Sequence, residues 1–214
     1  MAGVQYVRFS TVLSCISACI LVMMCPKMSG YFQAKKFGQN ALFALKCLMQ
    51  TIPESLKADV RPHQSVELLK ALHILTRDGK LNLDSRRKLK QVYHLVNFIE
   101  LLFNAVLAHN ANPTLVDHGA GKSYLGFILY DLLMKQNACG QVIGIETRAD
   151  LVEKSRQLAA NCGFTRMHFE HLTVEESITS AAIPAQVDIV TALHACNTAT
   201  DDAIQFGLQK HAQY

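Results

Sequence analysis

From residue 112 onward, short apolar segments alternate with longer amphipathic ones. Four segments have the length and apolar content of buried strands: PTLVDHG, GQVIGIE, RMHFEHL and AQVDIVTALHAC. Helical spacing occurs between or after them in KSYLGFILYDLLMKQ, RADLVEKSRQLAANCG and TATDDAIQFGLQKH. Strands that alternate with helices of about ten to fifteen residues favour right-handed βαβ units and a parallel sheet covered on both faces. The sequence therefore predicts a Rossmann-like α/β fold.

Residues 28–111 show helical periodicity instead, with apolar residues three or four positions apart. This spacing occurs in QNALFALKCLMQTI and in SVELLKALHILTRDG, and the second helix is expected to end at Gly79. A third, longer amphipathic helix is predicted in DSRRKLKQVYHLVNFIELLFNAVLAHN, capped by Asp84 or Ser85. We therefore expect a helical cap region over residues 28–111, followed by the α/β domain of residues 112–214.

Residues 1–27 form a hydrophobic leader that contains the uncharged run FSTVLSCISACILVMMCP. A run of this length nearly spans a bilayer and also suits a signal segment, and ISAC ending at Cys19 has the pattern of a lipidated cysteine. Serine and threonine dilute the run, so we expect a cytoplasmic protein, with a membrane anchor through residues 9–26 as the alternative. A third interpretation places the true translation start at a later methionine: Met23, Met24 or Met28.

The cysteine positions, the composition and the net charge limit which classes of protein the sequence can belong to. The seven cysteines form no C-x-x-C pair and no Cys/His cluster at metal-binding spacing, so we expect a reducing compartment, no disulfide framework and no structural zinc. Half of the residues are hydrophobic and 18% are charged, which indicates a globular chain. The formal net charge of +4 neither requires nor excludes an anionic partner such as nucleic acid.

The segment TLVDHGAGKSYLG, at the end of the first predicted strand, resembles two kinds of nucleotide-binding loop. A phosphate-binding P-loop that ends in 121–123 requires glycine where Val116 stands, and Asp188 precedes the apolar run of its strand instead of following it. A dinucleotide-binding loop requires glycine at Tyr124, but the third glycine is Gly126. The P-loop is therefore excluded, and a dinucleotide-dependent oxidoreductase remains a weaker alternative.

A different pattern fits this loop. Asp117, Gly119 and Gly121 form Asp-x-Gly-x-Gly at the end of the first strand, and Glu146 ends the second strand. Glycines let the backbone pass close beneath a ligand, and the helix that begins near Lys122 points free N–H groups toward a carboxylate. The Glu146 carboxylate can accept hydrogen bonds from both ribose hydroxyls of an adenosine. This pairing is typical of S-adenosylmethionine-dependent methyltransferases, whereas the alternative is a turn whose glycines serve packing alone.

Three blocks also resemble one family in the right order: VDHGAGKSYLGFILYDLL, IGIETRADLVEKS and DIVTALHACNTATDDAI. They resemble the bacterial branch of a Rossmann-like methyltransferase family whose eukaryotic relatives carry an Asp-x-Gly-x-Gly-Lys-Gly-Tyr-Leu loop. GKLNLDSRRKLKQVYHL is similar to the helix before that loop, so the resemblance covers about residues 65–214. It implies an S-adenosylmethionine-dependent methyltransferase and leaves the methyl acceptor open. Asn197 stands where an aspartate is expected, which argues against acid–base chemistry at that position.

The resemblance also implies a sheet with seven strands in the order 3-2-1-4-5-7-6. The sequence supplies the first four, so we expect the order 3-2-1-4 with strands five to seven missing. Strand four, VDIVTAL, would then be an unpaired edge, which favours self-association. The alternative to an active enzyme is a non-catalytic remnant that binds the cofactor or serves as an interaction module.

The expected cofactor site gathers residues that follow the first three strands. They are Asp117, Gly119, Ala120, Gly121, Lys122, Glu146, Leu172 and Thr173. The resemblance places the methionine end of the cofactor at the glycine loop, the ribose at Glu146 and the adenine between Leu172 and Thr173. Lys122 is expected to meet either the cofactor carboxylate or an acceptor phosphate.

The candidate catalytic residues His194, Cys196 and Asn197 follow strand four, where open α/β sheets place their ligand crevice. His194 could remove the acceptor proton or could only hydrogen-bond the loop backbone, and no base is visible that would make Cys196 a nucleophile. The Asn/Asp-Pro-Pro-aromatic signature of amino-group methylation is absent, which argues against an adenine amine as acceptor. The acceptor is therefore expected to be RNA or a small molecule. Four basic residues could contact RNA or form a solvated face: Arg86, Arg87, Lys88 and Lys90.

Overall fold

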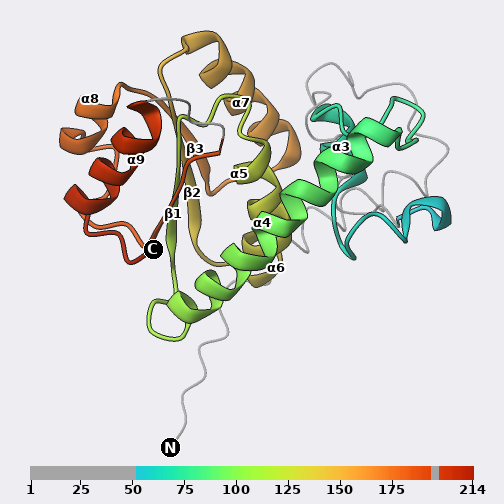
Figure 1. The fold of residues 1–214 in the computed structure, drawn as a ribbon, viewed down its shortest axis with the longest axis horizontal. Helices are drawn as coiled ribbons and strands as arrows, with labels where there is room; N and C mark the ends of the chain where they lie inside the picture. Colours follow the sequence, from blue (N-terminus) through green and yellow to red (C-terminus); the bar gives the residue numbers. More distant parts are fainter. Residues whose placement is uncertain (1–51, 194–197) are drawn as a thin grey trace, which may run out of the picture. The chain divides into compact units, whose positions relative to one another are not determined.

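The structure, a computed structural model, describes residues 52–193 and 198–214, which all belong to one compact unit, Gln39–Tyr214. Figure 1 shows the helices and strands of this part of the chain. In chain order they are η1 (Glu54–Leu56), α3 (Val66–Ala71), α4 (Leu83–Leu107), β1 (Thr114–His118), α5 (Tyr124–Leu129), η2 (Tyr130–Met134), α6 (Lys135–Asn137), β2 (Gln141–Glu146), α7 (Ala149–Cys162), β3 (Met167–His171), α8 (Val174–Thr179), β4 (Ile189–Thr191) and α9 (Thr198–Gln209).

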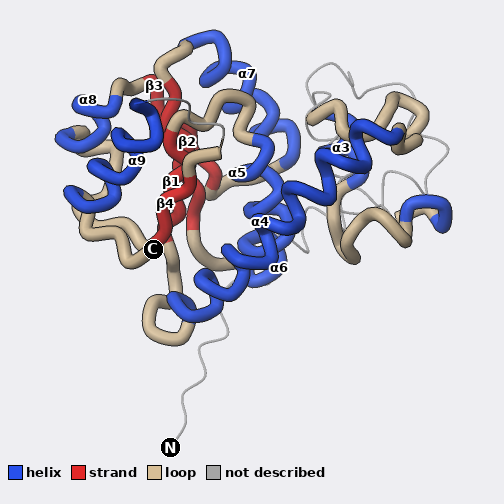
Figure 2. The backbone as a smooth tube through the Cα atoms, viewed as in Figure 1, coloured by secondary structure: helices blue, strands red, loops and turns tan. Residues whose placement is uncertain are grey.

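The four strands form one parallel sheet in the order β3-β2-β1-β4 (Figure 2). Val116 of β1 pairs with Ile143 of β2 on one side and with Val190 of β4 on the other. This order confirms the predicted Rossmann-like sheet. Because all four strands are parallel, their carboxyl ends meet at one edge, where the predicted site residues follow the strands.

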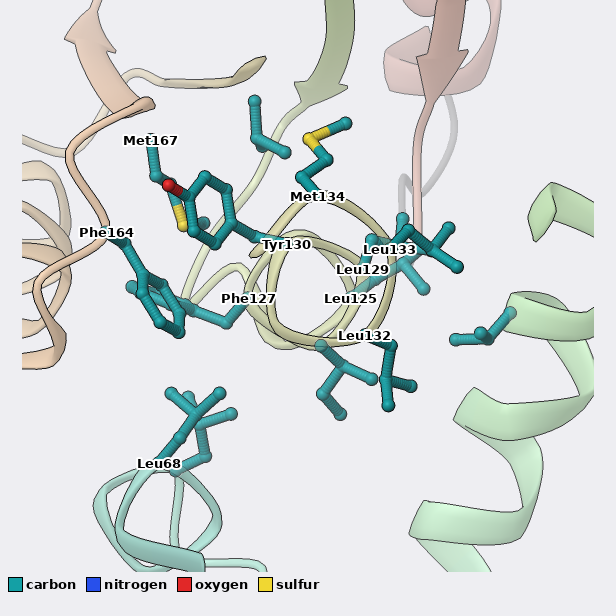
Figure 3. Packing of buried hydrophobic residues seen from close by; sticks show 14 of the residues in the cluster. Leu68, Leu125, Phe127, Leu129, Tyr130, Leu132, Leu133, Met134, Phe164 and Met167 are labelled. Carbon is teal, nitrogen blue, oxygen red and sulfur yellow. The ribbon is translucent and has the colours of Figure 1, made fainter. Parts of the chain in front are cut away.

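Helices cover both faces of the sheet, with α8 and α9 on one side and α4, α5 and α7 on the other (Figure 1). Successive β1 side chains alternate between the two faces, so Leu115 belongs to the larger buried cluster and Val116 to the smaller one. The larger cluster surrounds α5 and η2, where the Tyr130 ring stacks on Phe164 at a centroid distance of 4.5 Å (Figure 3). This packing fixes the helix that follows the glycine loop.

A π-helical turn, η2, interrupts the predicted helix KSYLGFILYDLLMKQ between α5 and α6. It contains Asp131, which is fully buried and accepts hydrogen bonds from the Ser65 backbone N–H at 2.7 Å and from Lys135 Nζ at 2.9 Å. Ser65 is also the N-cap of α3. Asp131 therefore ties the start of α3 to the helix behind the glycine loop.

Two helix boundaries differ from the predictions, and one helix was not predicted. The cap of α4 is Asn82, whose side-chain oxygen accepts from the Ser85 N–H at 2.7 Å, so the prediction of Asp84 or Ser85 was wrong. The helix expected to reach Gly79 ends at Ala71, because the chain turns into the left-handed region at His73, where φ is 56°. The short helix α8 was missed, although the capping box that begins it at Thr173 is visible in the sequence.

The edge of the sheet at β4 is not fully bare, which corrects the expectation of an unpaired fourth strand. The Tyr214 N–H donates to the Asp188 carbonyl at 3.1 Å, and the Val190 N–H donates to the Tyr214 carbonyl at 2.9 Å. This pair of bonds on either side of one residue is the pattern of a parallel neighbour. Tyr214 therefore satisfies the outer backbone groups at the start of β4.

Within the described ranges, no helix has both the length and the apolar content needed to cross a bilayer. The leader of residues 1–27, including the run 9–26, lies outside those ranges, as does the predicted helix QNALFALKCLMQTI except for its last residue, Ile52.

Candidate cofactor and active site

The loop between β1 and α5, residues 119–123, is the glycine loop, and it depends on left-handed backbone conformations. The φ angles are 63° at Gly119 and 56° at Gly121, and both are accessible to glycine at little cost. A Cβ placed on Gly119 would meet no described atom within 4 Å, so the space beside this residue is open. Ser123 is also left-handed, with φ of 48°, although it is not a glycine. The loop therefore exposes backbone at the carboxyl edge of the sheet.

Asp117, the acidic residue of β1, is buried beneath this loop. Its two carboxylate oxygens accept hydrogen bonds from the Ser123 hydroxyl at 2.7 Å and the Thr191 hydroxyl at 3.0 Å. Burial raises the pKa of Asp117 to about 6, while these hydroxyls and the Gly126 N–H oppose the rise. The group is therefore an anion at neutral pH that is held almost entirely by neutral donors.

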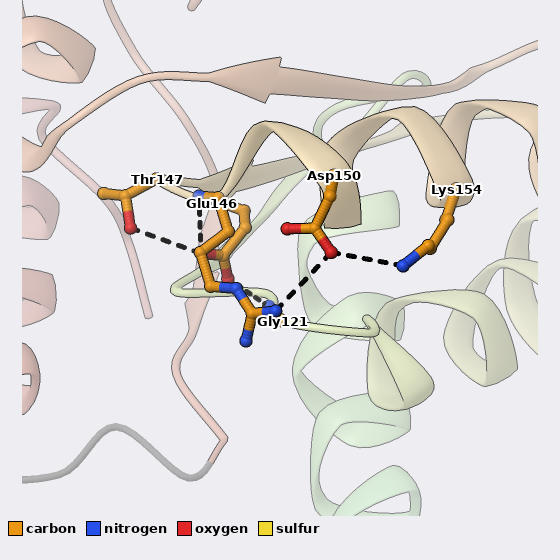
Figure 4. A network of polar contacts seen from close by, with 6 residues as sticks. Gly121, Glu146, Thr147, Asp150 and Lys154 are labelled. Carbon is orange, nitrogen blue, oxygen red and sulfur yellow. Dashed lines mark hydrogen bonds and ion pairs between the residues drawn. The ribbon is translucent and has the colours of Figure 1, made fainter.

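Glu146, at the end of β2, holds the glycine loop against the neighbouring strand (Figure 4). Its Oε2 accepts from the Gly121 N–H at 2.7 Å, and its Oε1 accepts from the Arg148 N–H at 3.0 Å. Thr147 adds a longer contact to Oε1 at 3.3 Å. A carboxylate has about four acceptor positions, so one remains free and the Thr147 position can be exchanged for a ligand hydroxyl. This geometry suits a ribose.

The predicted adenine-flanking residues follow β3 at the same edge. Leu172 is half-buried, and Thr173 is exposed and caps α8. The Thr173 hydroxyl accepts from the Glu176 N–H at 3.2 Å, and the Glu176 carboxylate accepts from the Thr173 N–H at 2.8 Å. A pocket of about 280 Å³ lies between α8 and α9, lined by Thr173, Ile178 and Asp202 among others. The structure thus brings Asp117, the glycine loop and Glu146 into direct contact and leaves Thr173 beside a separate pocket.

The candidate catalytic residues His194, Cys196 and Asn197 all lie outside the described residues. In the sequence they fall between β4 and α9, and their role stays a prediction.

Three residues of this region were missed by sequence reasoning: Ser123, Thr191 and His118. Ser123 and Thr191 are the side-chain partners of Asp117. His118 is buried against the Phe206 ring at a centroid distance of 5.3 Å, and its Nε2 has no hydrogen-bond partner among the residues described. Burial lowers the pKa of His118, and the nearby Asp202 opposes this shift. A polar residue within an apolar strand, such as Thr191, was the available signal.

The predicted basic surface at the start of α4 is partly neutralised. Arg86 forms an ion pair with Asp59 at 2.9 Å, and Arg87 lies 3.8 Å from Asp84. The next two basic residues, Lys88 and Lys90, are exposed. Lys122, in the glycine loop, is also exposed and lines a groove beside α7.

Comparison with known proteins identifies the type of domain. A family model described as a methyltransferase domain matches residues 87–214, more than half of the chain. A search of curated protein sequences gives no match.

Several solved structures share similarity with parts of the chain. The YcgJ protein from Bacillus subtilis is 19% identical over 50% of this chain and 44% of that chain, with a TM-score of 0.36. The C-terminal domain of precorrin-6Y C5,15-methyltransferase from Rhodobacter capsulatus is 27% identical over 40% of this chain and 44% of that chain, with a TM-score of 0.30. An rRNA methylase from Streptococcus thermophilus is 10% identical over 52% and 63% of the two chains, with a TM-score of 0.37. The chain therefore spans less than two thirds of each of these proteins.

Proposed function

Because the chain belongs to the methyltransferase-domain family, we propose that it is a methyltransferase that uses S-adenosylmethionine as methyl donor. The hydrogen bond between the Glu146 carboxylate and the Gly121 N–H supports this proposal most directly. It joins the ends of β1 and β2 at the place where an adenosine-containing cofactor needs both a close backbone and a ribose acceptor. A dinucleotide-binding loop would require its third glycine at position 124, where this chain has Tyr124.

The cofactor would bind along the carboxyl edge of the sheet. Asp117, with Gly119, Ala120 and Gly121, would hold the methionine end, since an anion at the floor of the loop attracts the cofactor ammonium group. Glu146 would accept the ribose hydroxyls. The adenine would lie near Leu172 and Thr173, and Lys122 would remain at the rim, facing the cofactor carboxylate or an acceptor phosphate.

In this proposal, bound S-adenosylmethionine supplies an electrophilic methyl group and its own leaving group. The protein therefore needs to align the acceptor with the methyl carbon and to remove a proton from the acceptor. His194 is the candidate base, and Cys196 and Asn197 would complete the loop that receives the acceptor. Asn197 has no acid–base function of its own, so its amide would orient the acceptor by hydrogen bonding.

RNA and a small molecule are the two acceptor classes proposed. The exposed side chains of Lys88 and Lys90 could contact an RNA backbone, whereas Arg86 is already paired with Asp59. The alternative to catalysis is a domain that binds the cofactor without transferring the methyl group. This alternative is favoured by Asn197, which stands where an aspartate is expected.

The test of the cofactor proposal is calorimetric titration of Glu146→Ala with S-adenosylmethionine. Loss of a charge-assisted hydrogen bond to ribose costs about 1.5–3 kcal/mol, so the affinity should fall tenfold or more. Glu153→Ala, which removes an exposed carboxylate from α7, is the matched control and should bind like the wild type. Equal affinity in wild type and Glu146→Ala would refute the assignment of Glu146.

A further inference from the structure

A groove of about 440 Å³ lies beside the glycine loop, between α7 and the residues at the end of α3. One wall is a single face of α7, on which Leu151, Lys154, Leu158 and Asn161 stand three or four positions apart. Lys122 of the glycine loop closes one side. The groove is therefore continuous with the loop that forms the candidate cofactor site, but it lies on the α7 side of that loop.

Among the described residues, Lys122 supplies an unpaired positive charge to this groove, and Lys154 supplies a second one that an ion pair partly neutralises. Lys122 is exposed and has no ion-pair partner in the described part of the chain. Lys154 is 73% exposed and forms an ion pair with Asp150 at 3.1 Å, as Figure 4 shows. The described residues that line the groove include two lysines and His73 but neither aspartate nor glutamate. An anionic group is therefore the charge class that fits between Lys122 and Lys154.

The remainder of the lining is suited to a flat, largely apolar group with a hydrogen-bond donor. Leu72, Leu151 and Leu158 provide apolar surface, and Tyr124 adds an aromatic ring. The Asn161 Oδ1 is buried and has no hydrogen-bond partner among the residues described. Asn161 lies seven residues after Lys154, which is about 10 Å along the helix. A ligand can therefore place an anion near Lys154 and an N–H donor near Asn161.

We propose that this groove binds a nucleotide of the methyl acceptor. Its phosphate lies between Lys122 and Lys154, its base packs on the leucine surface, and a base N–H group donates to Asn161. This inference rests on the proposed methyltransferase function and makes the acceptor an RNA chain, in which the groove holds a nucleotide beside the one that is methylated. Because Lys122 directly follows Gly121, the phosphate end of the ligand lies nearest to the cofactor loop.

Binding to the full chain can be measured with two probes, 5′-AMP by calorimetry and a short fluorescent single-stranded RNA by anisotropy. The first variant is Gln157→Glu, an exposed, nearly isosteric change that adds a negative charge to the groove, and its control is the exposed Gln91→Glu on α4. The second is Lys154→Gln, with the exposed Lys80→Gln as its control. Each groove variant should weaken binding of the probe about fivefold, and more at low salt, whereas the controls should not.

The two probes distinguish the source of the nucleotide. An RNA affinity that depends on Gln157 and Lys154 supports the proposal, whereas the same dependence for 5′-AMP alone would show a free-nucleotide site and overturn the assignment to RNA. Failure of both probes to bind would overturn the proposal, as would equal affinities in groove variants and controls. Loss of RNA binding only in Lys88→Gln or Lys90→Gln would place the RNA on α4 instead. S-adenosylmethionine binding is titrated in parallel, because its absence in the wild type would refute the cofactor proposal without affecting the groove.

Discussion

Asp117 combines a structural cost with the chemistry expected of a cofactor site. It is buried, and its carboxylate is held by two hydroxyls and a backbone N–H without a cation among its described partners. An ionised carboxylate in such a place is destabilising unless a ligand cation approaches it. The free protein should therefore be strained at this residue, and a cationic ligand group should relieve the strain.

This arrangement predicts a pH dependence of stability. The pKa of Asp117 is raised from 3.8 to about 6 in the folded state, so the folded protein binds this proton more tightly than the unfolded chain. The stabilising contribution is fully present below about pH 4 and is lost as the pH rises through about 6, by roughly 3 kcal/mol in total. In Asp117→Asn this component should vanish, and affinity for S-adenosylmethionine should also fall. Chemical denaturation of wild type and variant from pH 4 to pH 7 measures it, and identical pH profiles would contradict the burial argument.

The candidate site could be predicted only in part at the residue scale. Asp117, Gly121 and Glu146 could be proposed as site residues because glycines and strand-end carboxylates leave a spacing pattern in the sequence. Ser123 and Thr191 were not, because their contact with Asp117 depends on the register between β1 and β4 and on the left-handed turn at Ser123. The Ser123 hydroxyl offsets the cost of its left-handed backbone by donating a hydrogen bond to the Asp117 carboxylate.

At the scale of elements, α8 begins with a capping box that competes with the predicted ligand role of Thr173. Thr173→Ala should lower the free energy of unfolding by about 1 kcal/mol, the usual value of an N-cap side chain. Thr173→Ser keeps the hydroxyl and should restore most of that stability. Thermal unfolding of both variants measures the cap, and cofactor titration tests the adenine assignment separately. A Thr173→Ala variant with unchanged stability would show that the cap contributes nothing.

Element types were easier to predict than element limits. The alternation of strand and helix periods indicated β1, β2, β3 and α7, whose limits follow the apolar segments closely. The limits of α3 and α4 were wrong because Asn82 and His73 act through local side-chain and backbone geometry that periodicity does not report. The π-turn η2 also left no periodic signal, and the Ser65 N–H that donates to its Asp131 lies 66 positions away in the sequence.

At the scale of the whole molecule, the parallel sheet followed from the sequence pattern and its order from the family resemblance, whereas the state of the β4 edge followed from neither. Tyr214 forms hydrogen bonds with the outer backbone groups of Asp188 and Val190. No local sequence pattern predicts this contact between separate segments. The edge nevertheless remains short and lies beside α9. On this helix the apolar side chains of Ile204 and Leu208 are 59% and 74% exposed. An apolar surface next to a sheet edge favours association.

We therefore expect the chain to self-associate through the exposed apolar residues of α9. Light scattering over a range of concentrations should show a dimer or a larger assembly, and Leu208→Lys should shift the protein toward the monomer because it places a charge on the apolar surface. The exposed Gln205→Lys on the same helix is the control and should have little effect. A wild-type protein that stays monomeric at every concentration would contradict this expectation.

The most direct test of the central claim is a comparison of two cofactors on the wild-type chain. Calorimetric titration with S-adenosylmethionine, and separately with NADH, asks which adenosine-containing ligand the Asp117–Glu146 site accepts. We predict saturable one-to-one binding of S-adenosylmethionine and no heat of binding from NADH, because the loop lacks the third glycine at Tyr124 that a dinucleotide requires. Binding of NADH together with no detectable binding of S-adenosylmethionine would contradict the account.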